Sequence, residues 1–222
     1  MGTEAGSPRF KWTCGKGEVV AVSFDLFGTL VRQERPAEPW EAVAAELRTR
    51  DVPVPEDWEA AYRTSHTELE PGREQSLVTH VRAALASRGV DADRGAVRDA
   101  LLDAFGGPVE VRSGATEALA AAREHGPVGV LSNCSLPGLV DRTLSRTQLA
   151  PETVVTSVGC GWRKPHDRAF GAVADRLGVG VEDLVHVGDD PRADGGGRTA
   201  GVTVVLTDDI PLSAFPEWLE GR

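Results

Sequence analysis

Residues 19–30 read VVAVSFDLFGTL, and this stretch carries most of the information about the fold. Its first six residues are apolar apart from Ser23, which predicts a buried strand over residues 19–24. Asp25 comes directly after that strand, and the pair Gly28-Thr29 predicts a turn. A carboxylate at the end of a buried strand is costly to desolvate unless it is paired or bound to a metal. We therefore expect Asp25 to lie in a functional crevice.

The rest of the chain divides into a helical part and an alternating part. Between about residues 36 and 106 no strand-like run occurs, and apolar residues recur at helical spacing over 40–47, 58–69, 77–85 and 97–105. After Ser113, which suits a helix N-cap, predicted helices over 114–124, 137–145, 167–177 and 194–200 alternate with predicted strands over 128–131, 154–156, 184–187 and 202–206. Such alternation is typical of a parallel sheet covered on both faces.

The predicted fold class is α/β: a doubly wound, Rossmann-like parallel sheet with an all-helical cap subdomain inserted after the first strand. We expect residues 19–35 and 107–222 to form the α/β core, 36–106 the helical cap, and 1–18 an N-terminal tail. Turn residues near 31–36 and 106–113 predict the hinges of the cap. Open parallel sheets bind ligands at the carboxyl ends of their strands, so the functional residues are expected there.

The composition and net charge of the chain indicate which classes of molecule it binds. The chain has 222 residues and a formal net charge of −10 at pH 7, which argues against nucleic acid or a membrane surface and favours a small-molecule substrate. No stretch reaches the roughly 18 apolar residues of a membrane span, and the N-terminus lacks a secretory-signal pattern, so we expect a cytoplasmic protein. Cys14, Cys134 and Cys160 have no CxxC spacing, which predicts reduced thiols. The sequence does not indicate the oligomeric state.

Polar residues also follow the later strands. The predicted strand over 128–131 is followed by Ser132 and Asn133. The predicted strand over 184–187 is followed by Gly188-Asp189-Asp190, with Asp194 four residues further on. Lys164, one of only three lysines among 24 basic residues, lies in the loop after the strand over 154–156. Together with Asp25 the acidic residues make four carboxylates beside one lysine, an excess of three negative charges. Because Mg²⁺ prefers carboxylate, carbonyl, water and phosphate oxygens, the sequence predicts a Mg²⁺ site.

These residues resemble the four motifs of the haloacid dehalogenase superfamily of hydrolases. The first motif is matched by Asp25 with Gly28-Thr29, the second by Ser132, the third by Lys164-Pro165, and the fourth by Gly188-Asp189-Asp190 with Asp194. The resemblance extends over about residues 19–206, and the predicted helical insertion resembles the cap that this family carries between its first and second motifs. Each motif is a weak signal alone, but four in order at strand ends are a specific one.

The resemblance implies a role for each matching residue. Asp25 would be the nucleophile that forms an ester intermediate, which water then hydrolyses. Mg²⁺ would be held by Asp25, the carbonyl of Phe27 and Asp189. Asp190 and Asp194 would orient metal-bound waters and Lys164. Ser132 and Lys164 would act catalytically by stabilising charge on the transferred group and the nucleophile, and Thr29, Asn133 and Phe27 would border the substrate.

Phe27 departs from the phosphatase pattern. Most phosphatases of this superfamily have an aspartate two positions after the nucleophile, and such an acid/base contributes about 10²–10⁴-fold. An aromatic residue at this place, and Asn133 after Ser132, resemble the 2-haloacid dehalogenases, whose halide leaves without a proton. Against that reading, a metal-free site with several aspartates would repel the carboxylate of a haloacid. No residue stands out as the dehalogenase cap arginine; the candidates are Arg32, Arg35, Arg48 and Arg63.

Three functions stay open at this point. The first is a Mg²⁺-dependent phosphohydrolase that acts on a small phosphorylated metabolite through an aspartyl-phosphate at Asp25. The second is a metal-independent 2-haloacid dehalogenase-like hydrolase, and the third is a catalytically silent binding module. Some residues also suit ordinary structural roles: His186 as a core histidine, and Cys134 and Cys160 as small buried apolar residues.

Overall fold

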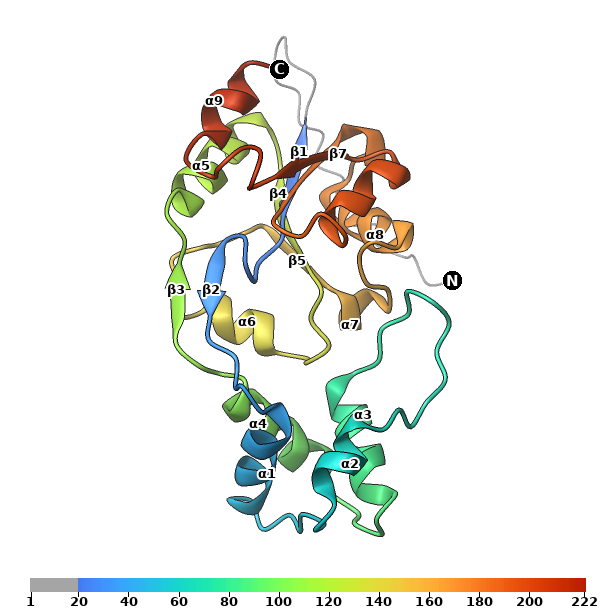
Figure 1. Ribbon diagram of the computed structural model, residues 1–222. Coiled ribbons are helices and arrows are strands. Elements are labelled where there is room, and N and C mark those ends of the chain that lie inside the picture. The colour runs from blue at the N-terminus through green and yellow to red at the C-terminus, as the bar shows by residue number, and fades with distance from the viewer. Residues whose placement is uncertain (1–19) are drawn as a thin grey trace, which may run out of the picture.

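A computed structural model describes residues 20–222, so the predicted tail over 1–18 and the first residue of the predicted strand lie outside the described residues. The centre of the fold is a five-stranded sheet in the order β5-β4-β1-β6-β7, and every neighbouring pair is parallel (Figure 1). The strands are β1 (Ala21–Phe24), β4 (Val128–Ser132), β5 (Thr153–Thr156), β6 (Leu184–Gly188) and β7 (Thr203–Leu206). This sheet confirms the predicted α/β, Rossmann-like fold class.

Helices cover both faces of the sheet. On one face lie α5 (Ala115–His125) and α9 (Phe215–Glu220), and on the other lie α8 (Asp167–Leu177) and the 3-10 helix η2 (Asp194–Ala200). Phe24 of β1 meets Phe215 edge-to-face, with 5.6 Å between the ring centroids, while Leu131 of β4 packs in the cluster around Phe170. Burial on both faces explains why the strands are continuous apolar runs in the sequence. The connections contain α6 (Leu139–Leu144), α7 (Ser157–Cys160) and η1 (Val181–Asp183).

The strand order brings the predicted site residues to one edge of the sheet. From β1 the chain continues to β4 and β5 on one side, then crosses to β6 and β7 on the other. The carboxyl ends of β1, β4 and β6 therefore meet at the point where the winding reverses, which is where open α/β sheets bind ligands. Asp25, Ser132 and Asp189 lie at these three ends.

Four helices lie apart from the sheet, in the lower part of Figure 1. They are α1 (Pro39–Arg48), α2 (Trp58–Arg63), α3 (Leu77–Ala86) and α4 (Arg94–Ala104). Contacts between α1 and α4 and between α2 and α3 hold them together, and the indole Nε1 of Trp58 donates to the Trp40 carbonyl at 2.8 Å. The assignment of residues 36–106 as a separate cap subdomain stays a prediction.

The helix predicted over 58–69 is shorter in the structure. α2 ends at Arg63 because Thr64 adopts an extended backbone (ψ 132°) and its hydroxyl donates to the Ala60 carbonyl at 2.7 Å. The Ala61 carbonyl at the end of the shortened helix accepts from the Thr64 backbone N–H at 3.3 Å, and His66 Nε2 lies 2.8 Å from it. The prediction of helix over 64–69 was therefore wrong.

Two short strands and one helix type were also missed. β2 (Val31–Gln33) and β3 (Val109–Val111) pair antiparallel within the segments predicted as hinges, and they connect the sheet to α1–α4 (Figure 1). Only Val31 among their residues is buried, so the sequence shows no strand pattern there. The helix predicted over 194–200 is a 3-10 helix, in which Gly196 packs so closely on Pro165 that a Cβ would lie 2.1 Å from the proline ring. No helix within residues 20–222 has the length and apolarity needed to cross a bilayer.

Candidate active site

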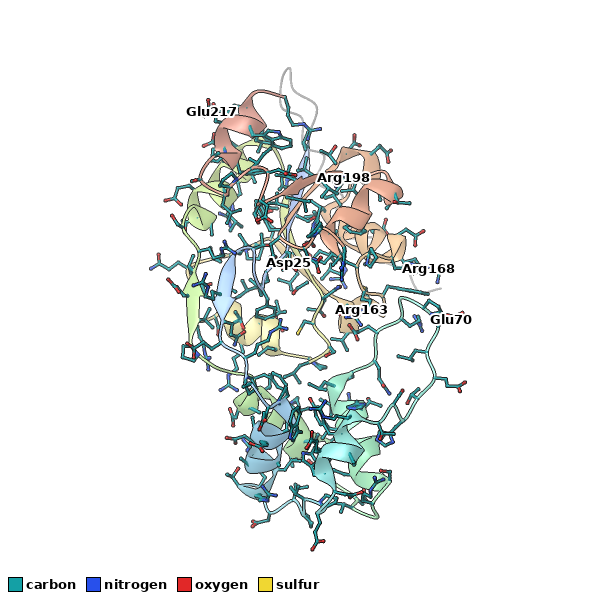
Figure 2. All side chains as sticks on the ribbon, in the orientation of Figure 1. Asp25, Glu70, Arg163, Arg168, Arg198 and Glu217 are labelled. Carbon is teal, nitrogen blue, oxygen red and sulfur yellow. The ribbon has the colours of Figure 1, made fainter. Side chains whose placement is uncertain are left out.

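Asp25 is held at the end of the central strand. Its backbone N–H donates to the Val187 carbonyl at 2.8 Å, so the residue is fixed against β6. The following loop folds back on itself, because Leu30 and Val31 both donate to the Leu26 carbonyl, at 3.0 and 2.9 Å. Figure 2 shows Asp25 near the middle of the molecule, at the end of the sheet nearer the four helices. Only 11% of its side chain is exposed.

Lys164 is the buried cation of the site. Its Nζ donates three hydrogen bonds: to Asp25 Oδ1 at 2.8 Å, to Asp194 Oδ1 at 2.6 Å and to the Leu131 carbonyl at 2.8 Å. These three acceptors match the three N–H bonds of an ammonium group. Burial alone would lower the pKa of Lys164, but the charges of Asp25 and Asp194 more than offset this and raise it above its ordinary value. Lys164 is therefore charged and fixed.

A buried chain of polar groups supports Asp194 from behind. His186 Nε2 lies 3.0 Å from Asp194 Oδ1, and His186 Nδ1 lies 2.8 Å from the Ser23 hydroxyl. Burial lowers the pKa of His186 to about 4, so the ring is neutral near pH 7. We assign the proton to Nε2, which then donates to Asp194 while Nδ1 accepts from Ser23. Burial raises the pKa of Asp194, but the His186 hydrogen bond and the Lys164 charge together hold it well below its usual range.

Asp189 lies over the loop that follows Asp25. Its Oδ1 accepts a hydrogen bond from the fully buried Thr29 hydroxyl at 2.7 Å. Gly28 has φ +103°, and a Cβ at that position would lie 2.4 Å from Asp189 Oδ2. Burial raises the pKa of Asp25 to about 6; Lys164 opposes this rise, and the carboxylates of Asp194 and Asp189 add to it. The two predicted metal-binding carboxylates are thus close enough to act on each other.

We expect a Gly28→Ala variant to lose activity. The added Cβ collides with the Asp189 carboxylate, and the positive φ costs about 1–3 kcal/mol in a non-glycine residue. Steady-state kinetics and urea unfolding should show a loss of at least about 10-fold in kcat/KM together with this loss of stability. Gly89→Ala is the matched control, because Gly89 also has positive φ (+75°) but no atom within 4 Å of the added Cβ. Full activity of the Gly28→Ala variant would contradict the close packing of Asp189 on the loop.

The second motif contributes one free hydroxyl and one structural amide. Ser132 is a buried residue, but among the described residues its hydroxyl has no hydrogen-bond partner and is not fully enclosed, so it is available to a ligand oxygen. The Asn133 amide instead donates to the Lys164 carbonyl at 2.9 Å and accepts from the Lys164 N–H at 2.8 Å. Asn133, predicted to border the substrate, therefore also fixes the backbone of Lys164.

The side chain of Asp190, unlike that of Asp194, does not contact Lys164. Its side chain is on an exposed turn, where Oδ1 accepts from the Arg192 N–H at 2.7 Å, and its backbone N–H donates to Asp194 Oδ2 at 2.9 Å. The contact with Lys164 belongs to Asp194 and not to Asp190. Asp190 thus supports the site through its backbone.

A family model described as haloacid dehalogenase-like hydrolase matches residues 19–201. The chain belongs to the haloacid dehalogenase-like hydrolases. This result confirms the resemblance drawn from the four motifs, and it identifies the protein as an enzyme. No curated protein matches the sequence of this haloacid dehalogenase-like hydrolase.

Solved structures share the fold at low sequence identity. A 2-haloacid dehalogenase from Pseudomonas syringae pv. Tomato DC3000 is 22% identical with a TM-score of 0.66, over 91% of this chain and 99% of that one. The L-2-haloacid dehalogenase from Xanthobacter autotrophicus is 20% identical with a TM-score of 0.55, over 92% of this chain and 84% of that one. A family enzyme from Bacteroides thetaiotaomicron, in complex with magnesium and inorganic phosphate, is 14% identical with a TM-score of 0.56, over 85% and 93%.

The oxygen ligands available in this haloacid dehalogenase-like hydrolase suit a hard cation that retains some coordinated water molecules. Within residues 20–222 no group of three or more His, Cys, Asp or Glu side chains is arranged to enclose a metal. The site offers two interacting carboxylates, Asp25 and Asp189, and the Phe27 carbonyl belongs to the loop that follows Asp25. Mg²⁺ is usually bound by one or two carboxylates together with water and substrate phosphate, so these donors suit it.

The sequence did not identify every residue of the site. The Ser23 hydroxyl and the Leu131 carbonyl lie inside strands in which no site residue was predicted. The prediction that His186 is a core histidine is confirmed, since the ring is fully buried and both nitrogens have hydrogen-bond partners; its contact with Asp194 was not predicted. A polar residue inside an otherwise apolar strand was the available signal for Ser23. Nothing in the sequence indicates which carbonyl a lysine will reach.

Proposed function

We propose that the protein is a Mg²⁺-dependent phosphohydrolase that acts on small phosphorylated metabolites through an aspartyl-phosphate at Asp25. The observation that carries the proposal is the charge at the strand ends. Asp25 and Asp194 share one ammonium group, Lys164, and the Asp189 carboxylate acts on Asp25. No other cation among the described residues pairs with these three carboxylates, since the His186 ring beside Asp194 is neutral. Such a site favours a divalent cation and a ligand that binds through that cation.

The chain's own residues support nucleophilic attack. Lys164 holds Asp25 by Oδ1, and Oδ2 has no hydrogen-bond partner among the described residues. In the first step an Oδ2–phosphorus bond forms and the bond from phosphorus to the ester oxygen breaks, so the alcohol leaves and takes a proton from water. In the second step the oxygen of a water molecule attacks phosphorus and releases inorganic phosphate and the Asp25 carboxylate. The free Ser132 hydroxyl and Lys164 stabilise charge during both steps.

Mg²⁺ would be held by Asp25, Asp189 and the Phe27 carbonyl. When bound, it supplies positive charge that offsets the repulsion between a carboxylate and a phosphate. Asp194 would keep Lys164 in place, since it accepts from both Lys164 and His186. The cytoplasm as the site of action remains a prediction from the sequence.

The direct test is phosphate release from p-nitrophenyl phosphate and from a panel of sugar, nucleotide and acyl phosphates, with Mg²⁺ and with EDTA. We expect release that needs Mg²⁺. A second candidate, metal-independent hydrolysis of 2-halocarboxylates, is favoured by Phe27, which cannot protonate an alcohol. Chloride release that survives EDTA, without phosphate release from any member of the panel, would replace the first proposal with the second.

A Phe27→Asp variant tests the missing proton donor. Placing a carboxyl group two residues after the nucleophile should raise turnover of alkyl phosphates by about 10²-fold, because these leaving groups need a proton. Turnover of p-nitrophenyl phosphate should rise much less, because its leaving group is a good one. Phe27→Asn is the control of similar size that carries no acid. An equal rise in both variants would attribute the effect to space in the pocket and not to proton transfer.

A further inference from the structure

Two hollows beside the nucleophile loop are both lined by Phe27. The first is a cavity of about 130 Å³ with mostly apolar walls, including Leu77, Phe105 and Leu136. The second, of about 320 Å³, is also lined by Gly28 and Arg112. Only Phe27, Gln33 and Arg35 line both hollows. A ligand that extends from one hollow into the other therefore meets these side chains.

Arg35 is the charged group that both hollows share. It is the one charged side chain among the residues lining the smaller cavity. Burial raises the pKa of the Cys134 thiol in the cavity wall, while a hydrogen bond to Leu136 and the charge of Arg35 act in the opposite direction. The positive charge of Arg35 thus acts on the inside of the cavity.

Within residues 20–222, Arg35 has no ion pair and no side-chain hydrogen bond. Its guanidinium carbon lies over the ring of Phe27, 5.8 Å from the ring centroid. Two neighbouring side chains are already bonded: Arg112 donates to the Gly28 carbonyl, and Gln33 donates to the Phe105 carbonyl at 3.0 Å. Arg32 also has no ion pair or side-chain hydrogen bond within residues 20–222, but it lines only the larger hollow. Among the described residues, Arg35 is therefore the unpaired cation that lines both hollows.

Two acidic side chains act on Cys134 against the charge of Arg35, but neither lines either hollow. Glu74, which also acts on Cys134, accepts a hydrogen bond from Ser157 at 2.7 Å and does not line either hollow. Asp141 acts on Cys134 too and is likewise absent from both linings. An arginine fork binds carboxylates and phosphates through two parallel hydrogen bonds.

We propose that Arg35 binds a second anionic group at the far end of the substrate, so that the enzyme selects phosphomonoesters with an anionic tail over those with an uncharged tail. The apolar walls of the smaller cavity would contact the carbon chain between the two anionic groups. This inference rests on the proposed phosphohydrolase function, which places the scissile phosphate at Asp25. The tail is either a carboxylate or a second phosphate, and both have the chemistry that a guanidinium recognises.

Binding of phosphonates, which the enzyme does not hydrolyse, tests the proposal by titration calorimetry of the full chain with Mg²⁺. The probes are butylphosphonate, 4-phosphonobutanoate and butane-1,4-bisphosphonate, and the variants are Arg35→Gln and, as control, Arg48→Gln, an exposed arginine that lines neither hollow. We expect the wild type to bind at least one anionic-tailed probe about 10-fold or more tightly than butylphosphonate. Arg35→Gln should erase this preference and change butylphosphonate affinity less than 2-fold, whereas Arg48→Gln should keep it. The tighter of the two anionic-tailed probes identifies the tail.

The results separate the inference from the function it rests on. Tight binding of butylphosphonate with no preference for an anionic tail, or a preference that survives Arg35→Gln, overturns the role of Arg35 and leaves the phosphohydrolase proposal standing. Equal loss of affinity for all three probes in the Arg35→Gln variant also overturns it, because the arginine would then act on the phosphate end. Absence of phosphonate binding together with absence of phosphate release from p-nitrophenyl phosphate would defeat both proposals.

Discussion

The Asp25→Asn variant is expected to lose phosphate release by about 10⁴-fold or more, the largest effect that any single substitution in this enzyme should have. An amide in place of the carboxylate cannot form the bond to phosphorus, while the shape of the side chain is kept. Steady-state phosphate release in the presence of Mg²⁺ measures the loss. Retention of more than about a tenth of the wild-type rate would exclude Asp25 as the nucleophile.

The same variant has a second readout that shows it is folded. Burial raises the folded-state pKa of Asp25 to about 6, so in the absence of metal this carboxyl group contributes stability below about pH 3.8, and that contribution is lost as the pH rises through 6. Asp25→Asn removes this dependence. In EDTA, the variant should therefore gain stability relative to the wild type as the pH is raised from 4 to 7. His186, whose lowered pKa makes the folded state less stable as the pH falls from 6.5 toward 4, is present in both proteins and cancels in the difference.

The Lys164→Met variant is expected to show the largest loss of stability, about 3–5 kcal/mol of unfolding free energy at pH 7. Removing the ammonium group leaves the Asp25 and Asp194 carboxylates and the Leu131 carbonyl without their shared donor. Urea unfolding measures the loss. Arg176→Met is the control, because Arg176 is an exposed cation on α8 and its replacement should change stability by no more than about 0.5 kcal/mol.

The pH dependence of the stability loss in Lys164→Met distinguishes the loss of a charge network from a simple loss of packing. Without Lys164, the pKa values of the two buried carboxyl groups rise, so the deficit should shrink as the pH is lowered and these groups become protonated. A double variant, Lys164→Met with Asp194→Asn, should recover part of the loss, because one unpaired buried charge is then absent. A deficit that does not depend on pH and that Asp194→Asn does not reduce would contradict the charge network.

The sheet and its strand-end residues could be predicted because both depend on short-range patterns. Each of the five strands contains an apolar run, and β1, β4 and β6 are buried throughout. Because parallel strands present their carboxyl ends together, the positions of Asp25, Ser132 and Asp189 followed from sequence order alone. Lys164 stood out because lysine is rare in this chain.

What could not be predicted depends on contacts between distant residues. The bond between Ser23 and His186 joins residues 163 positions apart, and no local pattern records it. β2 and β3 are stabilised by each other and have largely exposed side chains, so neither has the pattern of a buried strand. The position of Arg35 between two hollows likewise follows from the return of the chain after α1–α4.

The central claim is that Asp25 becomes covalently phosphorylated during turnover. The most direct measurement is mass spectrometry of enzyme quenched in acid during steady-state hydrolysis of p-nitrophenyl phosphate with Mg²⁺. The account predicts one added phosphoryl group, located on the peptide that contains Asp25 and absent from the Asp25→Asn variant. Turnover that proceeds with no phosphoryl group on that peptide, or with the group on another residue, would contradict it.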